Sequence, residues 1–310
     1  MNSKRRLLLA AALLMASGVR AVSFGTALFA APAKPTAPVG IKMPRPVRLR
    51  EVRGRGLLVS AWLNSTGPFT FAIDTGAGMT LISPRVAGAS RLSVRSASGR
   101  SIAGLSGRSV AVDEATIQTL AVGDRANAFP GSITAVVTSG LPTDIDGVLD
   151  PTQAFSPLGY VIDLPRLELS AFDPQTTPLS TDNQPPEGAV VPWLRERQSR
   201  RPFVQLDNGD RALLDTGSSL GLAIRDSSSA NHTNASLSRD VGGGQITTRR
   251  VKPTTVAIGA LLLRNIPTDL ISGAEADAPV LIGLSALRPF RLAFDPTHHL
   301  IEIAPVERRR

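Results

Sequence analysis

Two aspartates in this 310-residue chain occupy the same short motif, and an aspartate can act as an acid or as a base. Asp74 lies in AIDTGAG and Asp215 lies in LLDTGSS, and each follows an apolar run with the character of a strand. One Asp-Thr-Gly is an ordinary turn, whereas two at the ends of equivalent strands indicate a shared site. Two carboxyl groups held close together share one proton, so one can activate a water while the other polarises a carbonyl. The repeated motif therefore makes Asp74 and Asp215 candidate catalytic residues.

The elements that must position these aspartates form an internal repeat. After each aspartate come, in the same order, a glycine-rich segment, an apolar run ending in glycine, a short apolar element and a closing strand. The paired landmarks are Gly104–Gly107 with Gly242–Gly244, Leu120–Gly123 with Val256–Gly259, Val148–Leu149 with Leu281–Ile282, and Val161–Pro165 with Ala293–Pro296. Their common order predicts a duplicated domain. The 27 Gly and 24 Pro favour strands and turns over long helices, so the expected fold is all-β.

Composition and proline-rich stretches give the predicted boundaries. We expect a signal peptide over residues 1–31, a linker over 32–47, a first lobe over 48–172, a second linker over 173–190, a second lobe over 191–305 and a basic tail over 306–310. The leader has a basic start followed by an apolar run, with a cleavage site after Ala21 or nearer Ala30. Export by the general or the twin-arginine route stays open, as does an uncleaved anchor. The expected location is periplasmic or secreted, without stable membrane insertion after cleavage.

The sequence resembles the aspartic protease clan, which includes pepsin-like and retroviral-type enzymes, over residues 48–305. The resemblance rests on AIDTGAG and LLDTGSS, on Leu281-Ile282-Gly283, and on the closing strand FRLAFD at 290–295. It implies two homologous β-barrel-like lobes related by a pseudo-twofold axis, with few short helices, as in a two-lobed single-chain enzyme of bacterial type. It also implies peptide hydrolysis by two aspartates that meet at that axis, with no metal and no other cofactor.

The neighbours of each aspartate are expected to support the pair. The two threonines would hydrogen-bond across the lobe junction, and the two glycines would let the backbones approach closely. The hydroxyl of Ser218 could reach a carboxylate and lower its pKa, whereas Ala77 on the other side has no such donor. The predicted supporting residues are Thr75, Gly76, Thr216, Gly217 and Ser218.

The two glycine-rich segments are candidates for mobile hairpins that close over a substrate, with a plain surface loop as the alternative for each. Four residues in them are the predicted substrate-binding residues: Gly104, Leu105, Gly242 and Gly243. One such hairpin per lobe is closer to a fused retroviral-type dimer than to pepsin. The flap tyrosine of pepsin-like enzymes is absent, since the single tyrosine is Tyr160. A second departure is Asp150, which stands where the family has glycine.

The predicted function is that of an aspartic endopeptidase, and the alternative is a catalytically inactive two-lobed protein that binds peptides or envelope partners. The chain has no cysteine, which excludes disulfides, zinc–thiolate sites and a cysteine nucleophile. Its three histidines argue against a multi-histidine metal centre. The net charge is +9, but no aromatic residues are interleaved with the basic residues. We therefore expect polypeptide substrates and no nucleic-acid partner. The expected state is a monomer.

Overall fold

The computed structural model describes residues 42–196, 199–226 and 236–306. The predicted signal peptide, most of the first linker and most of the basic tail lie outside this part of the chain. Strands dominate the described residues, and three short helices accompany them: α1 (Pro84–Ala89), α2 (Pro151–Phe155) and α3 (Leu284–Leu287). The prediction of an all-β fold with few short helices is therefore confirmed. No helix in the described ranges is long and apolar enough to cross a membrane.

Each lobe is built around one large sheet. In the first lobe the order is β2 (Arg50–Val52), β3 (Gly56–Leu63), β4 (Thr66–Ile73), β10 (Gly147–Leu149), β5 (Leu81–Ile82), β9 (Ile133–Val137), β7 (Ser109–Ile117) and β6 (Val94–Ala103), and β8 (Leu120–Val122) pairs with β3. In the second lobe the order is β14 (Leu194–Glu196), β15 (Ser199–Gln205), β16 (Arg211–Asp215), β21 (Val280–Gly283), β17 (Leu222–Arg225), β20 (Leu261–Ser272), β19 (Gln245–Ile258) and β18 (Ser236–Arg239).

The two sheets have the same topology, so the repeat in the sequence is a repeat in structure. β4 and β10 run parallel, as β16 and β21 do. The next pairs, β10 with β5 and β21 with β17, are antiparallel in both lobes. Beyond them β5 is parallel to β9 and β17 is parallel to β20. The strand that leads to each aspartate is thus an interior strand, hydrogen-bonded on both sides.

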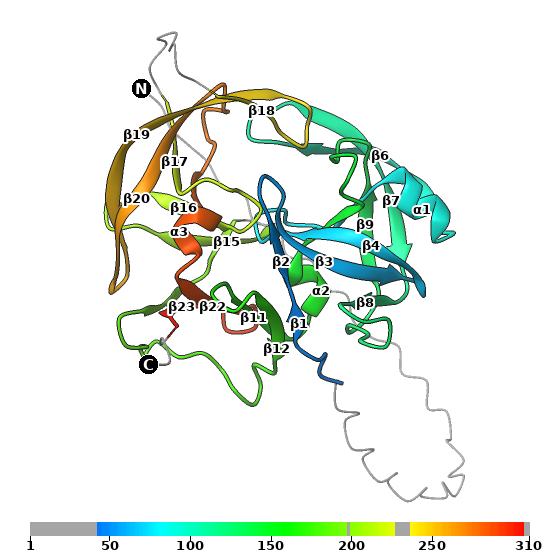
Figure 1. The fold of residues 1–310 in the computed structure, drawn as a ribbon, viewed down its shortest axis with the longest axis horizontal. Coiled ribbons are helices and arrows are strands. Elements are labelled where there is room, and N and C mark those ends of the chain that lie inside the picture. The colour runs from blue at the N-terminus through cyan, green and yellow to red at the C-terminus, as the bar shows by residue number, and fades with distance from the viewer. Residues whose placement is uncertain (1–41, 197–198, 227–235, 307–310) are drawn as a thin grey trace, which may run out of the picture. The chain divides into compact units, whose positions relative to one another are not determined.

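A third sheet joins the lobes, in the order β1 (Val47–Arg48), β12 (Glu168–Phe172), β11 (Gly159–Asp163), β22 (Phe290–Asp295), β23 (Leu300–Pro305) and β13 (Ala189–Pro192). At its centre β11 lies beside β22 (Figure 1), and Val161 of β11 pairs with Ala293 of β22. Asp163 and Asp295 are equivalent in the repeat, and each lies two residues beyond a member of this pair. A residue that pairs with its own equivalent lies on the local twofold axis, so the axis passes between Val161 and Ala293.

The core is continuous between the lobes beneath this sheet. Tyr160 is fully buried there and stacks on Phe294 with ring centroids 4.6 Å apart, and on Phe155 at 5.6 Å. Its hydroxyl lies 2.9 Å from the Thr152 hydroxyl. The single tyrosine is therefore a packing residue at the lobe junction. It is not a flap residue.

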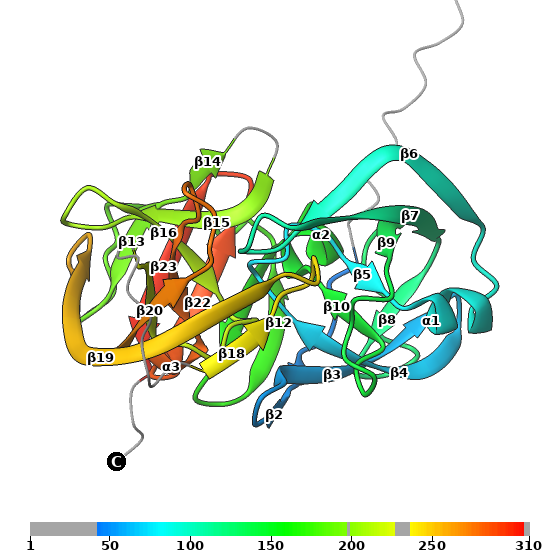
Figure 2. The ribbon, with the colours of Figure 1, turned by 90° about the horizontal axis from the view of Figure 1, so that it is seen from above.

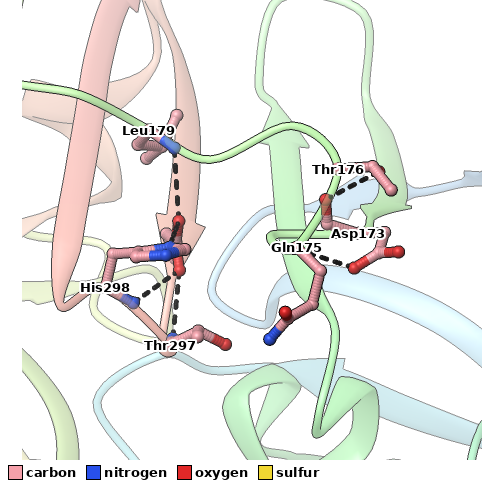
Figure 3. A network of polar contacts seen from close by, with 7 residues as sticks. Asp173, Gln175, Thr176, Leu179, Thr297 and His298 are labelled. Atoms are coloured by element: carbon pink, nitrogen blue, oxygen red, sulfur yellow. Dashed lines mark hydrogen bonds and ion pairs between the residues drawn. The ribbon is translucent and has the colours of Figure 1, made fainter.

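Polar contacts hold the first part of the segment between the lobes (Figure 3). Asp173 accepts the Gln175 N–H at 2.9 Å, which forms a turn after β12. Further on, Leu179 N–H donates to Asp295 Oδ2 at 3.2 Å, while the other oxygen of Asp295 accepts the N–H groups of Thr297 and His298. Strand β13 then begins at Ala189, within the stretch predicted as linker over 173–190.

Candidate active site

Asp74 and Asp215 meet at the lobe junction because equivalent interior strands end there. The Asp74 N–H donates to Leu149 O at 3.1 Å, so the backbone after β4 continues along β10. Asp215 ends β16 beside Gly283 of β21. Each aspartate carboxyl lies next to the glycine of the other lobe's motif, and both aspartate side chains are partly buried. The structure thus brings the two predicted catalytic residues together.

Thr75 and Thr216 hold the two strand ends by reciprocal hydrogen bonds. Thr75 N–H donates to Thr216 Oγ1 at 3.2 Å, and Thr216 N–H donates to Thr75 Oγ1 at 3.1 Å. Each hydroxyl also donates across the junction, from Thr75 to Leu214 O at 2.6 Å and from Thr216 to Ile73 O at 3.3 Å. Both threonines are fully buried. These contacts fix each aspartate through the residue that follows it.

Gly76 and Gly217 leave no room for a side chain. A Cβ on Gly76 would lie 2.7 Å from Asp215 Cγ, and a Cβ on Gly217 would overlap the Asp74 carboxyl. Each glycine N–H also donates to the aspartate before it, Gly76 to Asp74 at 2.7 Å and Gly217 to Asp215 at 2.9 Å. The glycines therefore set the separation of the lobes at the site and supply one hydrogen bond to each carboxyl.

Ser218 contributes differently from the expectation. Its backbone N–H donates to Asp215 Oδ1 at 3.1 Å. Its hydroxyl oxygen instead accepts the Leu220 N–H at 3.3 Å, which forms a turn within the same loop. The hydroxyl contact with a carboxylate that the sequence suggested is thus replaced by a backbone contact, because the local turn competes for the side chain. Among the described residues Asp215 receives two backbone donors, whereas Asp74 receives one, from Gly76.

Burial and mutual repulsion raise the pKa of the pair. Burial raises the pKa of Asp74 well above its usual range, and the charge of Asp215 raises it further. Burial also raises the pKa of Asp215, but the hydrogen bond from Asp74 and the two backbone N–H groups act in the opposite direction. The positive charge of Arg201 also lowers the pKa of Asp215. Sequence reasoning did not single out Arg201, since nothing in the motif indicates that β15 passes this close.

Asp150 lies in the first lobe where Gly283 lies in the second. It is fully buried and precedes α2, where its Oδ1 accepts the Thr152 N–H at 3.0 Å. Its other oxygen, Oδ2, has no hydrogen-bond partner among the described residues. Burial raises the pKa of Asp150 to about 7. The negative charge of Asp150 in turn raises the pKa of Asp74. The departure that the sequence revealed therefore lies next to the dyad.

The glycine-rich segments are the tips of two hairpins, β6–β7 and β18–β19, which approach each other along one face (Figure 2). Asp240 joins the tips, because one of its oxygens accepts the Ser106 N–H at 2.8 Å and the other accepts the Gly244 N–H at 2.9 Å. A Cβ on Gly104 would overlap the Asp240 carboxyl, and one on Gly242 would overlap the Arg108 carbonyl oxygen. Asp240 was not predicted, since its sequence context is that of an ordinary turn residue.

Each hairpin also reaches the apolar residues of the opposite lobe. Leu105 packs on the second-lobe cluster that includes Phe203 and Leu281, and its carbonyl oxygen accepts the Glu275 N–H at 2.9 Å. Val241 packs on the first-lobe cluster of Leu81, Val112 and Val136. Of the four predicted substrate-binding residues, Gly104, Leu105 and Gly242 thus lie in the contact between hairpins and lobes. Gly243 occupies the turn itself with φ +75° and has nothing within 4 Å of a Cβ position.

A cavity of about 460 Å³ lies beside the first hairpin. One of its lining residues is Met79, which follows Asp74 by five positions in the sequence. Met79 and Val136 supply apolar lining, while Arg100, Glu114 and Arg200 supply charge. Its volume would admit a large peptide side chain. In the described part of the chain no group of three or more His, Cys, Asp or Glu could hold a metal ion.

A comparison with known families gives a match within the first lobe. Residues 59–149 match the model of a family described as aspartyl protease. The matched segment runs from β3 to β10 and contains Asp74, while Asp215 lies outside it. A search of curated proteins gives no match. The match supports a place for the chain in the aspartic protease clan and a protease function in general terms.

Proposed function

We propose, from the premise that the first lobe carries an aspartyl protease domain, that this chain is an aspartic endopeptidase with the dyad Asp74 and Asp215. The observation that carries the proposal is the meeting of two partly buried carboxyl groups, one from each lobe, each packed against the glycine of the other lobe's motif. The raised pKa of both groups supports a singly protonated pair over a wide pH range. Such a pair supplies an acid and a base at one point.

In the proposed reaction the ionised carboxylate takes a proton from a water, whose oxygen attacks the carbon of the scissile carbonyl. The protonated carboxyl donates its proton to the carbonyl oxygen, which gives a neutral gem-diol. The gem-diol then collapses: one of its hydroxyls gives its proton to the ionised carboxylate, the C–N bond breaks, and the amine leaves with the proton of the other carboxyl, so the pair again holds one proton. The reaction consumes one water and needs no metal. The glycine N–H groups keep the ionised form oriented throughout.

The proposed substrates are extended polypeptides bound beneath the two hairpins. The contact between hairpin tips through Asp240 would cover a bound chain and exclude water from the site. The cavity beside Met79 would receive one substrate side chain, with an apolar wall and a charged rim. We further propose a monomer that acts in the periplasm or outside the cell, where the predicted leader would direct it.

The test is cleavage of an unfolded polypeptide by the purified protein, with and without a peptide inhibitor that contains statine. Statine resembles the tetrahedral intermediate, so it should abolish cleavage by an aspartic dyad. The alternative is an inactive peptide-binding protein, which would bind the statine peptide without cutting the substrate at any pH. Cleavage that survives statine but stops with a metal chelator or a serine-directed reagent would contradict the proposal.

A further inference from the structure

The position of Asp150 in the sheet places a third carboxyl beside the pair of Asp74 and Asp215. Leu149 pairs with Ile73 in the parallel ladder of β10 and β4, so Asp150 and Asp74 are the next residues along neighbouring strands. In the second lobe the same ladder pairs Asp215 with Gly283. The first lobe therefore carries a carboxyl where the second lobe carries a hydrogen atom.

The surroundings of Asp150 hold its carboxyl group in place but give a hydrogen bond to one of its two oxygens only. Its Oδ1 is held by the Thr152 N–H at the start of α2, while the buried Oδ2 is left without a partner in the described residues. A buried carboxyl oxygen without a partner is costly when charged. In the described part of the chain, three charged or titratable groups interact electrostatically with Asp150. They are Asp74 after β4, Tyr160 of β11 and Arg200 of β15.

The surroundings of Asp74 and Asp215 differ in a way that favours the shared proton on Asp74, which is also the effect expected of a charge on Asp150. Asp215 has two backbone donors and the nearby positive charge of Arg201, all of which favour its ionised form. Asp74 has one backbone donor and a neighbouring acid, which favours its protonated form. The surroundings of both aspartates therefore favour a pair in which Asp74 carries the proton and Asp215 is ionised.

We propose that Asp150 is a positioning residue for the dyad: as it ionises, its charge holds the shared proton on Asp74 and leaves Asp215 as the base that accepts the proton of the water. This assignment rests on the proposed function. It follows that the singly protonated, active form of the pair persists to higher pH than it would with a neutral residue at position 150.

The sign of the effect follows from the order of ionisation. Burial raises the pKa of Asp150 to about 7, so the group is neutral at acidic pH and acquires its charge near neutrality. A negative charge beside Asp74 opposes the loss of the last dyad proton. Removing the charge should move the alkaline limb of the activity profile to lower pH by about 0.5–1 unit, while the acid limb moves much less.

The experiment compares pH–rate profiles of the full protein and three variants on a fluorogenic peptide. Asp150→Asn keeps the oxygen that accepts the Thr152 N–H, and Asp150→Gly restores in the first lobe the residue type of the second. The matched control is Asp173→Asn, because Asp173 also precedes a proline and caps the N–H two residues on, yet is not among the groups that perturb the dyad. The alkaline limb should shift down in both position-150 variants and stay in place in the control.

A second measurement keeps the two proposals distinguishable. The carboxyl carbons of Asp74 and Asp215 can be followed by NMR as pH changes, in the wild type and in Asp150→Asn. A lower final titration midpoint at Asp74 in the variant supports the inference even if the protein cleaves nothing, an outcome that would defeat only the proposed function. Cleavage by the wild type with coincident alkaline limbs, or coincident Asp74 titrations, would overturn the role of Asp150.

Discussion

Asp74 and Asp215 differ in their donors, yet the proposed chemistry needs both of them. Replacing either with asparagine removes a shared charge with almost no change of shape, so the fold should persist. We expect Asp74→Asn and Asp215→Asn each to lower kcat by at least about 1,000-fold, because each removes an acid–base group. Initial rates on a fluorogenic peptide measure the loss, and circular dichroism checks the fold. Activity near wild type in either variant would refute a shared dyad.

Thr75 gives a prediction about stability that is separate from catalysis. Its hydroxyl accepts one hydrogen bond and donates another across the junction, and the residue is fully buried. Thr75→Val keeps the shape but leaves the Thr216 N–H and the Leu214 carbonyl without these partners. We expect the free energy of unfolding to fall by about 3 kcal/mol, measured by urea denaturation.

Thr75→Ser is the control for that measurement, because it keeps the hydroxyl and removes only a methyl group. It should stay within about 1.5 kcal/mol of the wild type. A valine variant as stable as the wild type would mean that the reciprocal hydrogen bonds of the Thr75 hydroxyl do not stabilise the junction.

At the scale of elements, the contact of each hairpin tip with the opposite lobe can be tested by mutation. Leu105 packs on the opposite lobe, so Leu105→Ala should weaken the closed arrangement over a bound substrate. We expect kcat/KM to fall by about 10-fold, mainly through KM. The control is Leu237→Ala on the β18–β19 hairpin, where the side chain is 63 % exposed. An equal effect from both variants would show that closure does not depend on the Leu105 contact.

The sequence predicted these elements unevenly, for physical reasons. The strand pattern and the repeated motif predicted the all-β duplicated fold, since period-2 runs and turn residues are local signals. They also singled out Asp150 as a departure. The pairing of the hairpin tips through Asp240 and the approach of Arg201 were not predicted, because such contacts depend on how distant strands are brought together. The turn in which the Ser218 hydroxyl oxygen accepts the Leu220 N–H was also not predicted.

At the scale of the whole molecule, the buried carboxyls make stability depend on pH. Asp150 has its pKa raised from 3.8 to about 7 in the folded state. Between these values the unfolded chain releases the proton that the folded protein keeps, so the free energy of unfolding falls as pH rises and levels off above about pH 7. The fall attributable to Asp150 is at most about 4 kcal/mol.

Asp150→Asn should therefore gain stability relative to the wild type as pH rises. We expect the two proteins to unfold at similar urea concentrations near about pH 4, and the variant to be more stable by up to about 4 kcal/mol near about pH 8. Asp173→Asn, the same change at a capped turn in the segment between the lobes, should show no such trend. A constant difference at all pH values would mean that Asp150 titrates alike in the folded and unfolded chain.

Val161 and Ala293 pair on the local twofold axis, and this pairing bears on which substitutions each half can accept independently. A dimer of identical chains must present the same residue on both sides of its axis, so any change to its site occurs twice. Here both halves are parts of one chain, and equivalent positions differ: Asp150 corresponds to Gly283, and Ala77 corresponds to Ser218. Covalent fusion thus permits broken symmetry at the centre, and the assembled site no longer depends on the concentration of the protein.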